Sequence, residues 1–494
     1  MCFGDEWDVP GSIWARIPGV FHPVESSNER SGPPKPKVFI DLVLCYAGME
    51  YLPSGLWDHF DFLSESSFPL SASHRTNSVA RMNSLVPLLG LVVFVGIAWL
   101  LSADRKRFPW RTVVGGLSLQ LLVEVFTLRT GTGHALFLAL DKAFNKVLGF
   151  ANEGCAMVFG PLANQSLLTE KWGPGNGFLF AVTVTGTIIL VSALSSLLYH
   201  FGVLQVVVRA LAWVMQKLMR TSGSESLAAA ANIFMGQTEA PLVVKPYLKG
   251  MTRSELLALM VPGMASIAGG VLAAYVSFGI NAGHLLTASI MSAPAALMMS
   301  KILMPESERS ETRDGASAEI EKETVNGIDA ICHGASDGMK LALNVMAMLV
   351  AFVAVVALAN YLLSLGLRTV GVHEARPMQL VLGWLNAPFA WLMGIPWKDC
   401  MAAGSILGER IVLNEFIGYL SLSKAGLEPR SAMLTTYALC GFANFSSIAI
   451  QIGGISALAP ERRSDLAQLG FISMVGGLLS CYSTAAVVAL VAER

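Results

Sequence analysis

The chain has 494 residues, of which 53% are hydrophobic and only 14% are charged. Soluble globular domains carry about 25% charged residues, so this composition excludes a water-soluble protein of this length. Lys and Arg (34) balance Asp and Glu (35) to a net charge of −1, which leaves no basic excess for binding nucleic acid. The cysteines are scattered without CxxC pairs, which argues against a disulfide scaffold or a zinc site. The composition indicates a membrane protein.

Apolar stretches long enough to span a bilayer recur along the chain after residue 81. A helix needs about 20 apolar residues to cross a hydrocarbon core of ~30 Å. Six stretches of that length lack acidic and basic residues, and two weaker ones carry Glu124 or Lys301. In chain order, the eight predicted spans are Met82–Ala103, Val113–Leu128, Gly177–Tyr199, Leu256–Gly283, Leu285–Leu303, Leu341–Leu367, Ala432–Pro460 and Leu466–Ala492.

The charges between the spans predict an orientation. Basic residues follow each odd-numbered span, as Arg105, Lys106 and Arg107 follow the first, whereas the turn Gly279–Gly283 after the fourth has none. Because Lys and Arg are retained on the cytoplasmic side, we expect the odd-numbered spans to exit into the cytoplasm. Both chain ends would then lie on the periplasmic or extracellular side of an inner (plasma) membrane.

Two segments differ in composition from the spans. Residues 1–81 contain no apolar run long enough to span and no secretory signal pattern, so we expect an extension outside the fold, disordered or arising from a mis-assigned start. The stretch Glu306–Glu323 holds ten charged residues in eighteen and no aromatic residue, which predicts a solvated, mobile cytoplasmic linker.

Two further apolar segments are interrupted by polar residues near their middle. Thr221–Gly250 breaks at Gly236–Pro241, and Trp397–Leu422 carries Asn414 and Glu415 among apolar residues. Each half is about ten residues long, which is enough to reach the bilayer midplane and return. Both segments therefore predict re-entrant hairpins, whose non-helical tips must be buried in protein or line a water-filled cavity.

The two hairpins belong to a repeat. Each follows an amphipathic segment, Val203–Leu218 or Met378–Ile395, and each precedes a long span with a polar break, at Ala265–Gly270 or Phe442–Ala449. With the orientation above, the hairpins enter from opposite faces, so the repeat is inverted. Paired interrupted segments in inverted halves are the best sequence indication of a transporter site at the midplane.

The polar residues at these breaks have a structural alternative. A carboxylate near the bilayer centre costs about 2.5–3.5 kcal/mol, which favours a functional role. Thr238 and Glu239 could instead cap a helix, and Glu415 could form an ion pair with Arg410. Serines at the breaks could bond to helix carbonyls; they are Ser266, Ser446 and Ser447. The chain has no HExxH, P-loop or GxSxG motif, so an intramembrane enzyme is not supported.

Four motifs carry a resemblance to a known family. GQTEAPLVVKPYL (Gly236–Leu248), ASIAGG (Ala265–Gly270), NEFIGY (Asn414–Tyr419) and CGFANFSSIAI (Cys440–Ile450) closely resemble the bacterial type of the sodium-coupled concentrative nucleoside transporter family. The resemblance runs from about Met82 to the C-terminus.

It implies an all-α membrane protein with eight transmembrane helices and two re-entrant helical hairpins in an inverted repeat. It also implies a homotrimer in which a transport domain moves against a scaffold, the elevator form of alternating access. The expected domains are the extension 1–81, scaffold spans 1–3 in 82–200, a first transport repeat 201–305, the cytoplasmic linker 306–327, a scaffold interfacial helix and span 6 in 328–376, and a second transport repeat 377–494.

The resemblance also assigns site residues. Those that would meet the nucleobase are Gln237, Thr238 and Glu239. Those that would hold the ribose hydroxyls are Glu415, Asn444 and Ser447, with Phe442 as an aromatic wall. The sodium site would use Asn232, Ser266 and the carbonyls of Met235 and Ile267; the family has Val at the position of Met235, a change that a carbonyl ligand tolerates. The chemistry of these side chains supports the same roles without the resemblance. A carboxylate accepts strong hydrogen bonds from hydroxyl groups, and an amide can both donate to and accept from the edge of a nucleobase.

The expected function is therefore the import of nucleosides with Na⁺ by a secondary symporter that sits among membrane lipids. A proton-coupled symporter is the closest alternative, although proton-coupled relatives lack the Asn that matches Asn232. A channel is less favoured, because single acids at hairpin tips differ from the rings of charge that select ions. Purine and pyrimidine preference stays open.

Overall fold

The computed structural model describes residues 72–173, 177–313, 315, 324–369, 371 and 374–492, with side chains from residue 85 onward. The chain divides into two units, and the description below concerns the one from Ser73 to Arg494. The predicted extension 1–81 lies outside the described residues, except for the helical backbone that begins at Ala72. Every regular element in the described part of the chain is a helix.

Each predicted span corresponds to a helix or to a pair of helices separated by a break. Among the described residues, six of these units are long and apolar enough to cross a membrane, and α3 and α19 add shorter apolar helices. The spans are α3 (Ala72–Leu100), α4 (Trp110–Arg129), α7 (Phe180–His200), the pair α11 (Arg253–Ala265) and α12 (Gly269–Ser277), α13 (Ala282–Leu303), α14 (Gly327–Arg368), the pair α18 (Pro429–Leu439) and α19 (Phe445–Leu458), and α20 (Arg463–Val491).

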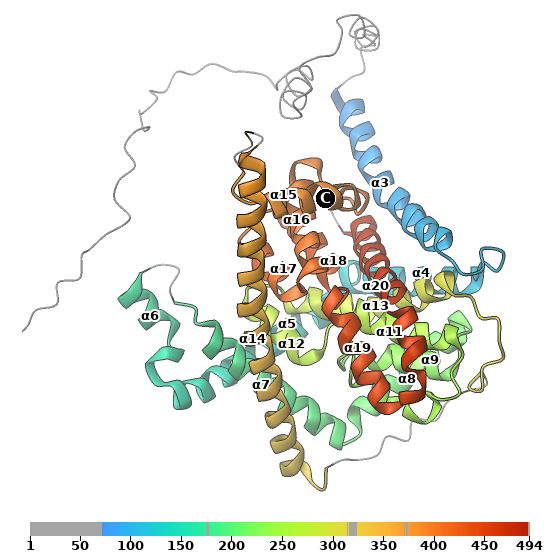
Figure 1. The fold of residues 1–494 in the computed structure, drawn as a ribbon, viewed down its shortest axis with the longest axis horizontal. Coiled ribbons are helices and arrows are strands. Elements are labelled where there is room, and N and C mark those ends of the chain that lie inside the picture. The colour runs from blue at the N-terminus through green and yellow to red at the C-terminus, as the bar shows by residue number, and fades with distance from the viewer. Residues whose placement is uncertain are drawn as a thin grey trace, which may run out of the picture. The chain divides into compact units, whose positions relative to one another are not determined.

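The segments between the spans are also largely helical. The two amphipathic segments form α8 (Val203–Met219) and α15 (Pro377–Leu392). Between the second and third spans, where no helix was predicted, the chain forms α5 (Gly131–Phe159) and α6 (Gln165–Trp172). The predicted interfacial helix and sixth span are one continuous helix, α14, which Figure 1 shows as a long rod beside the other helices.

Both interrupted segments fold back on themselves, but the first differs from the prediction. Hairpin 1 (Thr221–Gly250) has a regular first arm, α9 (Gly223–Ala231), begun by a capping box between Ser222 and Glu225. Its second arm is only two short turns, α10 (Ala240–Val243) and η3 (Lys245–Tyr247). Pro241 is tolerated in the first turn of α10, whereas Pro246 lacks the N–H that would continue the helix. Hairpin 2 (Trp397–Leu422) has two helical arms, α16 (Trp397–Val412) and α17 (Glu415–Leu422).

The centre of the bundle consists of α11, α13 and α20, which are almost entirely buried, whereas α4, α7 and α14 expose much of their apolar surface. In α14 the exposed residues include Val350, Leu358, Tyr361 and Leu362. α7 packs closely along α14, where a Cβ at Gly334 would lie 2.6 Å from the carbonyl oxygen of Ser192. The exposed apolar faces therefore suit contact with lipid or with another protein chain.

The backbones of α15 and α16 also approach each other closely, and this contact predicts the effect of a substitution at Gly404. A Cβ at Gly404 would lie 2.7 Å from both the Ala387 nitrogen and the Gly383 carbonyl oxygen, which are backbone atoms that cannot rotate away. We expect Gly404→Ala to destabilise the protein by about 1–3 kcal/mol. Gly149→Ala in α5, where nothing lies within 4 Å, is the control and should be neutral or slightly stabilising. Thermal unfolding of the two purified variants compares them, and equal melting temperatures would contradict the prediction.

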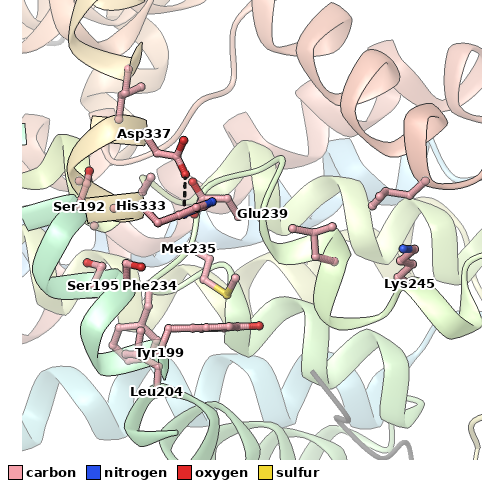
Figure 2. Close-up of a pocket in the computed structure, with 18 of the residues that line it drawn as sticks. Ser192, Ser195, Tyr199, Leu204, Phe234, Met235, Glu239, Lys245, His333 and Asp337 are labelled. Atoms are coloured by element: carbon pink, nitrogen blue, oxygen red, sulfur yellow. Dashed lines mark ion pairs between the residues drawn. The ribbon is translucent and has the colours of Figure 1, made fainter. Parts of the chain in front are cut away.

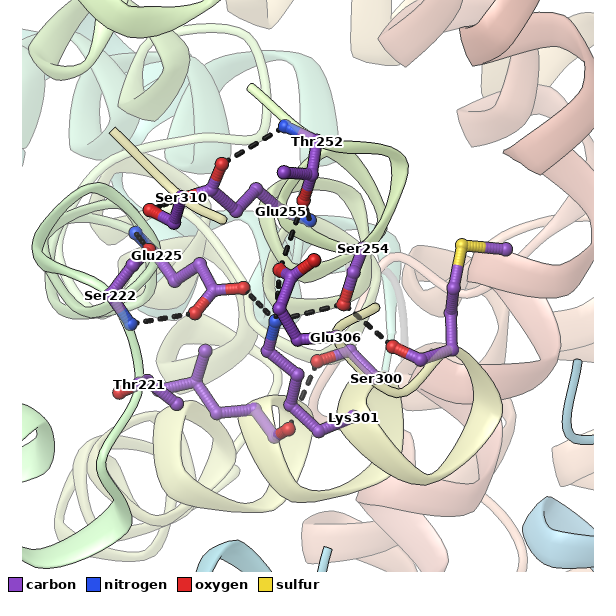
Figure 3. A network of polar contacts seen from close by, with 12 residues as sticks. Thr221, Ser222, Glu225, Thr252, Ser254, Glu255, Ser300, Lys301, Glu306 and Ser310 are labelled. Atoms are coloured by element: carbon purple, nitrogen blue, oxygen red, sulfur yellow. Dashed lines mark hydrogen bonds and ion pairs between the residues drawn. The ribbon is translucent and has the colours of Figure 1, made fainter. Parts of the chain in front are cut away.

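A buried polar network joins the base of hairpin 1 to α11, α13 and the segment after α13 (Figure 3). Lys301 forms ion pairs with Glu225 and with Glu306, the latter at 3.4 Å. The hydroxyls of Ser310 and Thr312, both nearly buried, donate to Glu255. The first part of the predicted linker is thus docked rather than solvated, because its hydroxyls satisfy a buried carboxylate; residues 316–323 lie outside the described residues.

Candidate functional site

The two broken spans contact each other at their breaks. The Phe442 nitrogen donates a hydrogen bond to the Ser266 carbonyl at 3.3 Å, so the non-helical residues after α11 meet those after α18. The Cys481 thiol of α20 lies within 3.6 Å of the Ala265 carbonyl and 3.5 Å of the Cys440 carbonyl. A Cβ at Gly441 would be 2.7 Å from the Met264 carbonyl oxygen, so the crossing requires glycine there.

The tip of hairpin 2 places Glu415 at this crossing. Asn414 caps α17, its side chain accepting from the Ile417 nitrogen, so the adjacent carboxylate begins the helix. Glu415 is 3% exposed. Its Oε1 accepts a hydrogen bond from the Tyr275 hydroxyl at 3.0 Å, and its Oε2 accepts one from the Asn444 amide at 3.2 Å.

The alternative of an ion pair between Arg410 and Glu415 is not what the described residues show. The buried guanidinium donates to the Ala438 carbonyl at 2.5 Å and lies over the Tyr482 ring, with 6.0 Å from Cζ to the ring centroid. No ion pair joins it to Glu415 in the described part of the chain. The carboxylate is held by neutral donors and keeps capacity to accept further hydrogen bonds.

The start of α19 connects this group to hairpin 1. Asn444 is the N-cap of α19, and its Oδ1 accepts from the Ser447 nitrogen at 2.9 Å. The Ser447 hydroxyl accepts from the Gln237 amide at 3.2 Å. A continuous chain of hydrogen bonds therefore runs from hairpin 1 through α19 to hairpin 2 and Tyr275 of α12. We name these five residues the polar chain: Gln237, Ser447, Asn444, Glu415 and Tyr275.

Glu239 and Thr238 lie apart from the polar chain, with exposed side chains on the tip of hairpin 1. The Glu239 carboxylate accepts from the Gly236 nitrogen at 3.1 Å and makes no cap bond to α10. Thr238 packs against α19, where a Cβ at Gly454 would be 2.9 Å from its Cγ2. The capping alternative is therefore not seen for Glu239, whereas the Ser266 hydroxyl does bond to a helix carbonyl, that of Pro262 at 2.8 Å.

A cavity of about 800 Å³ opens beside the tip of hairpin 1 (Figure 2). Its wall is formed by hairpin 1, the start of α12, and the facing sides of α7 and α14. Of the site residues assigned from the sequence, Met235 and Glu239 line it, whereas the ribose group and Phe442 do not. Figure 2 places Glu239 next to His333 and Asp337 of α14, which pair at 3.2 Å. Gln237 and Thr238 are likewise absent from its lining, so the cavity borders the tip of hairpin 1 and the polar chain lies outside it.

The residues assigned to sodium include a buried oxygen without a partner. Asn232 is 1% exposed; its amide donates to the Ala228 carbonyl at 3.0 Å, and its Oδ1 has no hydrogen-bond partner among the described residues. Within the same described set, no backbone hydrogen bond outside the helices uses the carbonyls of Met235 or Ile267. Carbonyls of unwound segments are suitable Na⁺ ligands, so this donor set fits a sodium ion.

Two residues with polar roles near the site were missed in the sequence. Tyr275 offered no signal, because a tyrosine in an apolar span is ordinary there. Gln451 did offer one, as an amide within the apolar half-span α19. It is 1% exposed, its Nε2 donates to the Met260 carbonyl at 3.0 Å, and its Oε1 is unpartnered among the described residues.

Comparison with known proteins gives consistent results along the chain. Three family models match: "Na+ dependent nucleoside transporter N-terminus" at 89–162, "Nucleoside recognition" at 181–282, and "Na+ dependent nucleoside transporter C-terminus" at 284–489. An uncharacterized transporter of Haemophilus influenzae is 44% identical over 419 residues, covering 83% of this chain and 98% of the relative. Nucleoside permease NupC of Helicobacter pylori is 39% identical over 415 residues, covering 83% and 98%.

Solved structures agree with the fold. The transporter CNTnw in an inward-facing substrate-bound state superposes with a TM-score of 0.78 at 40% identity, covering 83% of this chain and 97% of that one. A variant of it in an outward-facing state gives 0.79, again at 40% identity, with 83% and 98% covered. The predicted all-α membrane fold of the elevator type is confirmed. The chain belongs to the concentrative, Na⁺-dependent nucleoside transporter family, whose members are transporters rather than enzymes.

Proposed function

We propose that this protein imports nucleosides together with Na⁺ by elevator-type alternating access. The observation that carries the proposal is the polar chain, which links the tips of both hairpins and both broken spans into one group of hydrogen-bonding side chains. Ribose hydroxyls can donate to the Glu415 carboxylate, and the Gln237 amide can pair with a base edge. A site of this kind rejects analogues that leave its own polar groups unpaired.

In this proposal the cavity is the route between the site and one aqueous phase. Glu239 stands at the boundary, since it belongs to hairpin 1 and also lines the cavity. The bond between Gln237 and Ser447 closes the hairpin against α19 and must be exchanged for bonds to the substrate. Substrate entry therefore requires hairpin 1 or its neighbours to shift.

Sodium is the proposed coupling ion because the buried Asn232 Oδ1 lacks a partner. We expect Asn232→Ala to raise the Na⁺ concentration for half-maximal uptake by at least about tenfold, the effect of losing ~1.4 kcal/mol of ion binding. Asn386→Ala is the matched control, because the Asn386 amide makes the same type of bond, to Leu382 four residues earlier, far from the ion residues in sequence. A similar Na⁺ dependence for both variants would contradict the assignment.

The function itself is tested with purified protein in proteoliposomes. We expect uridine to accumulate inside the proteoliposomes when an inward Na⁺ gradient is imposed. Without the gradient, we expect no accumulation. Uptake in Na⁺-free buffer that is driven by an imposed pH gradient would establish the proton-coupled alternative. Uridine flux that is independent of both the Na⁺ and the pH gradient would indicate a channel. A thermal-shift screen of uridine, adenosine, guanosine and thymidine, with and without Na⁺, determines the substrate class.

The setting of the transporter is also a proposal. The basic loops after the odd-numbered spans support an inner or plasma membrane location with both termini periplasmic or extracellular. The exposed apolar face of α14 supports a homotrimer surrounded by lipid. Crosslinking in membranes, resolved by gel electrophoresis, tests the trimer.

A further inference from the structure

Glu124 is a buried carboxyl group that the proposed transport site does not use. Its side chain is 0% exposed, and neither carboxyl oxygen has a hydrogen-bond partner among the described residues. It lies in α4, a helix long and apolar enough to span a membrane, little more than one turn before the last residue, Arg129. Ionisable groups at such positions are rare in membrane helices and usually serve a function.

The surroundings of Glu124 are polar but neutral. One turn earlier on α4, Gln120 accepts a hydrogen bond from the Thr484 hydroxyl of α20 at 3.3 Å. On α18, which packs against α13 and α20, Tyr437 carries a buried hydroxyl. The same hydroxyl lies 3.2 Å from Nδ1 of His284, which is half-buried in the first turn of α13.

Among the residues that the structure describes, no cation forms a hydrogen bond or an ion pair with Glu124. On α4 itself, the Nε of Arg129 donates to the Val491 carbonyl at 3.1 Å. On α5, the Asp141 carboxylate accepts a hydrogen bond from the Ala282 nitrogen at 3.2 Å, and Arg209 of α8 bonds within its own helix. Within the described part of the chain, Glu124 is therefore fully buried without a hydrogen bond or an ion pair.

An ionised carboxylate in this place would lose its hydration and gain nothing in return. Groups in that situation neutralise instead of remaining charged, and a carboxylate does so by taking up a proton. The neutral acid can remain among the packed side chains of α4, α13 and α20 at a much smaller cost. The packing seen here therefore belongs to the protonated form of Glu124.

We propose that Glu124 is a proton-binding site of this transporter, occupied at neutral pH in the packing seen here. The binding step forms one O–H bond on the Glu124 carboxylate and breaks one O–H bond of a hydronium ion, which leaves as water. Loss of that proton at alkaline pH leaves an unpaired charge between α4 and the buried helices α13 and α20. Transport then slows as the pH rises, because the packed arrangement is disfavoured.

Proton binding is tested without any nucleoside, by comparing wild type with Glu124→Gln, which mimics the protonated acid. In infrared spectra of the purified protein at pH 7, we expect a protonated-carboxyl carbonyl band that the variant lacks. The unfolded chain ionises Glu124 near pH ~4.3. Above that value the Glu124 contribution to wild-type stability falls as the pH rises, and the variant lacks this contribution. The melting temperature of the variant minus that of wild type should therefore grow between pH 5 and pH 8.

Glu153→Gln, at an exposed position of α5, is the control and should leave both the band and the pH dependence unchanged. An unaltered carbonyl band in Glu124→Gln, or a melting-temperature difference that is the same at both pH values, would overturn the proposal. Because no substrate is present, this outcome is independent of whether the proposed nucleoside transport is correct.

The consequence for transport rests on the proposed function and has a separate readout. In proteoliposomes with a fixed Na⁺ gradient, we expect wild-type uridine uptake to fall severalfold between pH 6 and pH 9. Uptake by Glu124→Gln should stay within twofold over that range. The same pH profile in both proteins would refute a role in transport, even if the proton is bound.

Discussion

Uridine uptake by Glu415→Gln is expected to fall about 100-fold or more relative to wild type. The carboxylate accepts hydrogen bonds from Tyr275 and Asn444, and it is the proposed acceptor for the ribose hydroxyls. An amide in its place turns an NH₂ group toward one of these donors and removes the charge. Hydrogen bonds to charged groups contribute about 1.5–3 kcal/mol each, so losing two costs roughly 3–6 kcal/mol, a factor of about 10²–10⁴. Initial uptake rates in proteoliposomes at low uridine concentration measure the effect.

Glu409→Gln is the matched control in the same hairpin. Glu409 is also nearly buried and accepts hydrogen bonds, from Ser421 at 2.6 Å and from Gln379 at 3.3 Å, but it does not belong to the polar chain. Its uptake should stay within a few-fold of wild type. An equal loss of uridine uptake in both variants would contradict a specific role of Glu415, because it would show that hairpin 2 requires both glutamates for its folding. Size-exclusion profiles of both proteins establish that they assemble normally.

Lys301→Met is expected to be the most destabilising single change, at about 3–5 kcal/mol. The ammonium group is buried in the network of Figure 3, where it pairs with Glu225 and donates to the Ser254 hydroxyl at 2.8 Å. Glu225 is 1% exposed, so removal of its partner leaves a charge that water cannot reach. Breaking a buried pair from one side carries a penalty of this size. Thermal unfolding of the detergent-purified protein measures the loss.

The double variant Lys301→Met with Glu225→Gln separates this mechanism from simple loss of packing. With both charges absent, no unpaired ion remains, and most of the lost stability should return. A double variant as unstable as Lys301→Met alone would mean that the shape of the lysine side chain, rather than its charge, stabilises the base of hairpin 1.

Much of the fold followed from local patterns. Apolar length identified the spans, since a helix that crosses lipid must satisfy its own backbone and present apolar side chains. Polar interruptions with glycine and proline identified both hairpins and both broken spans, and the resemblance of their motifs indicated the family. Where Pro246 follows the first turn of the second arm of hairpin 1, the expected helix is reduced to short turns.

The pairing of those elements required the tertiary structure. Gln237 and Ser447 are 210 residues apart, and Tyr275 and Glu415 are 140 apart; no periodicity encodes which of many polar side chains will meet across such distances. The burial of Glu124 was equally hidden, because a lone acid in a weak span is compatible with lipid, water or a neighbouring helix. The sequence by itself determined that this is a helical transporter with two hairpins. Packing decided which carboxylates are paired, which face the cavity, and which one must hold a proton, because burial and partners are set by residues remote in the chain.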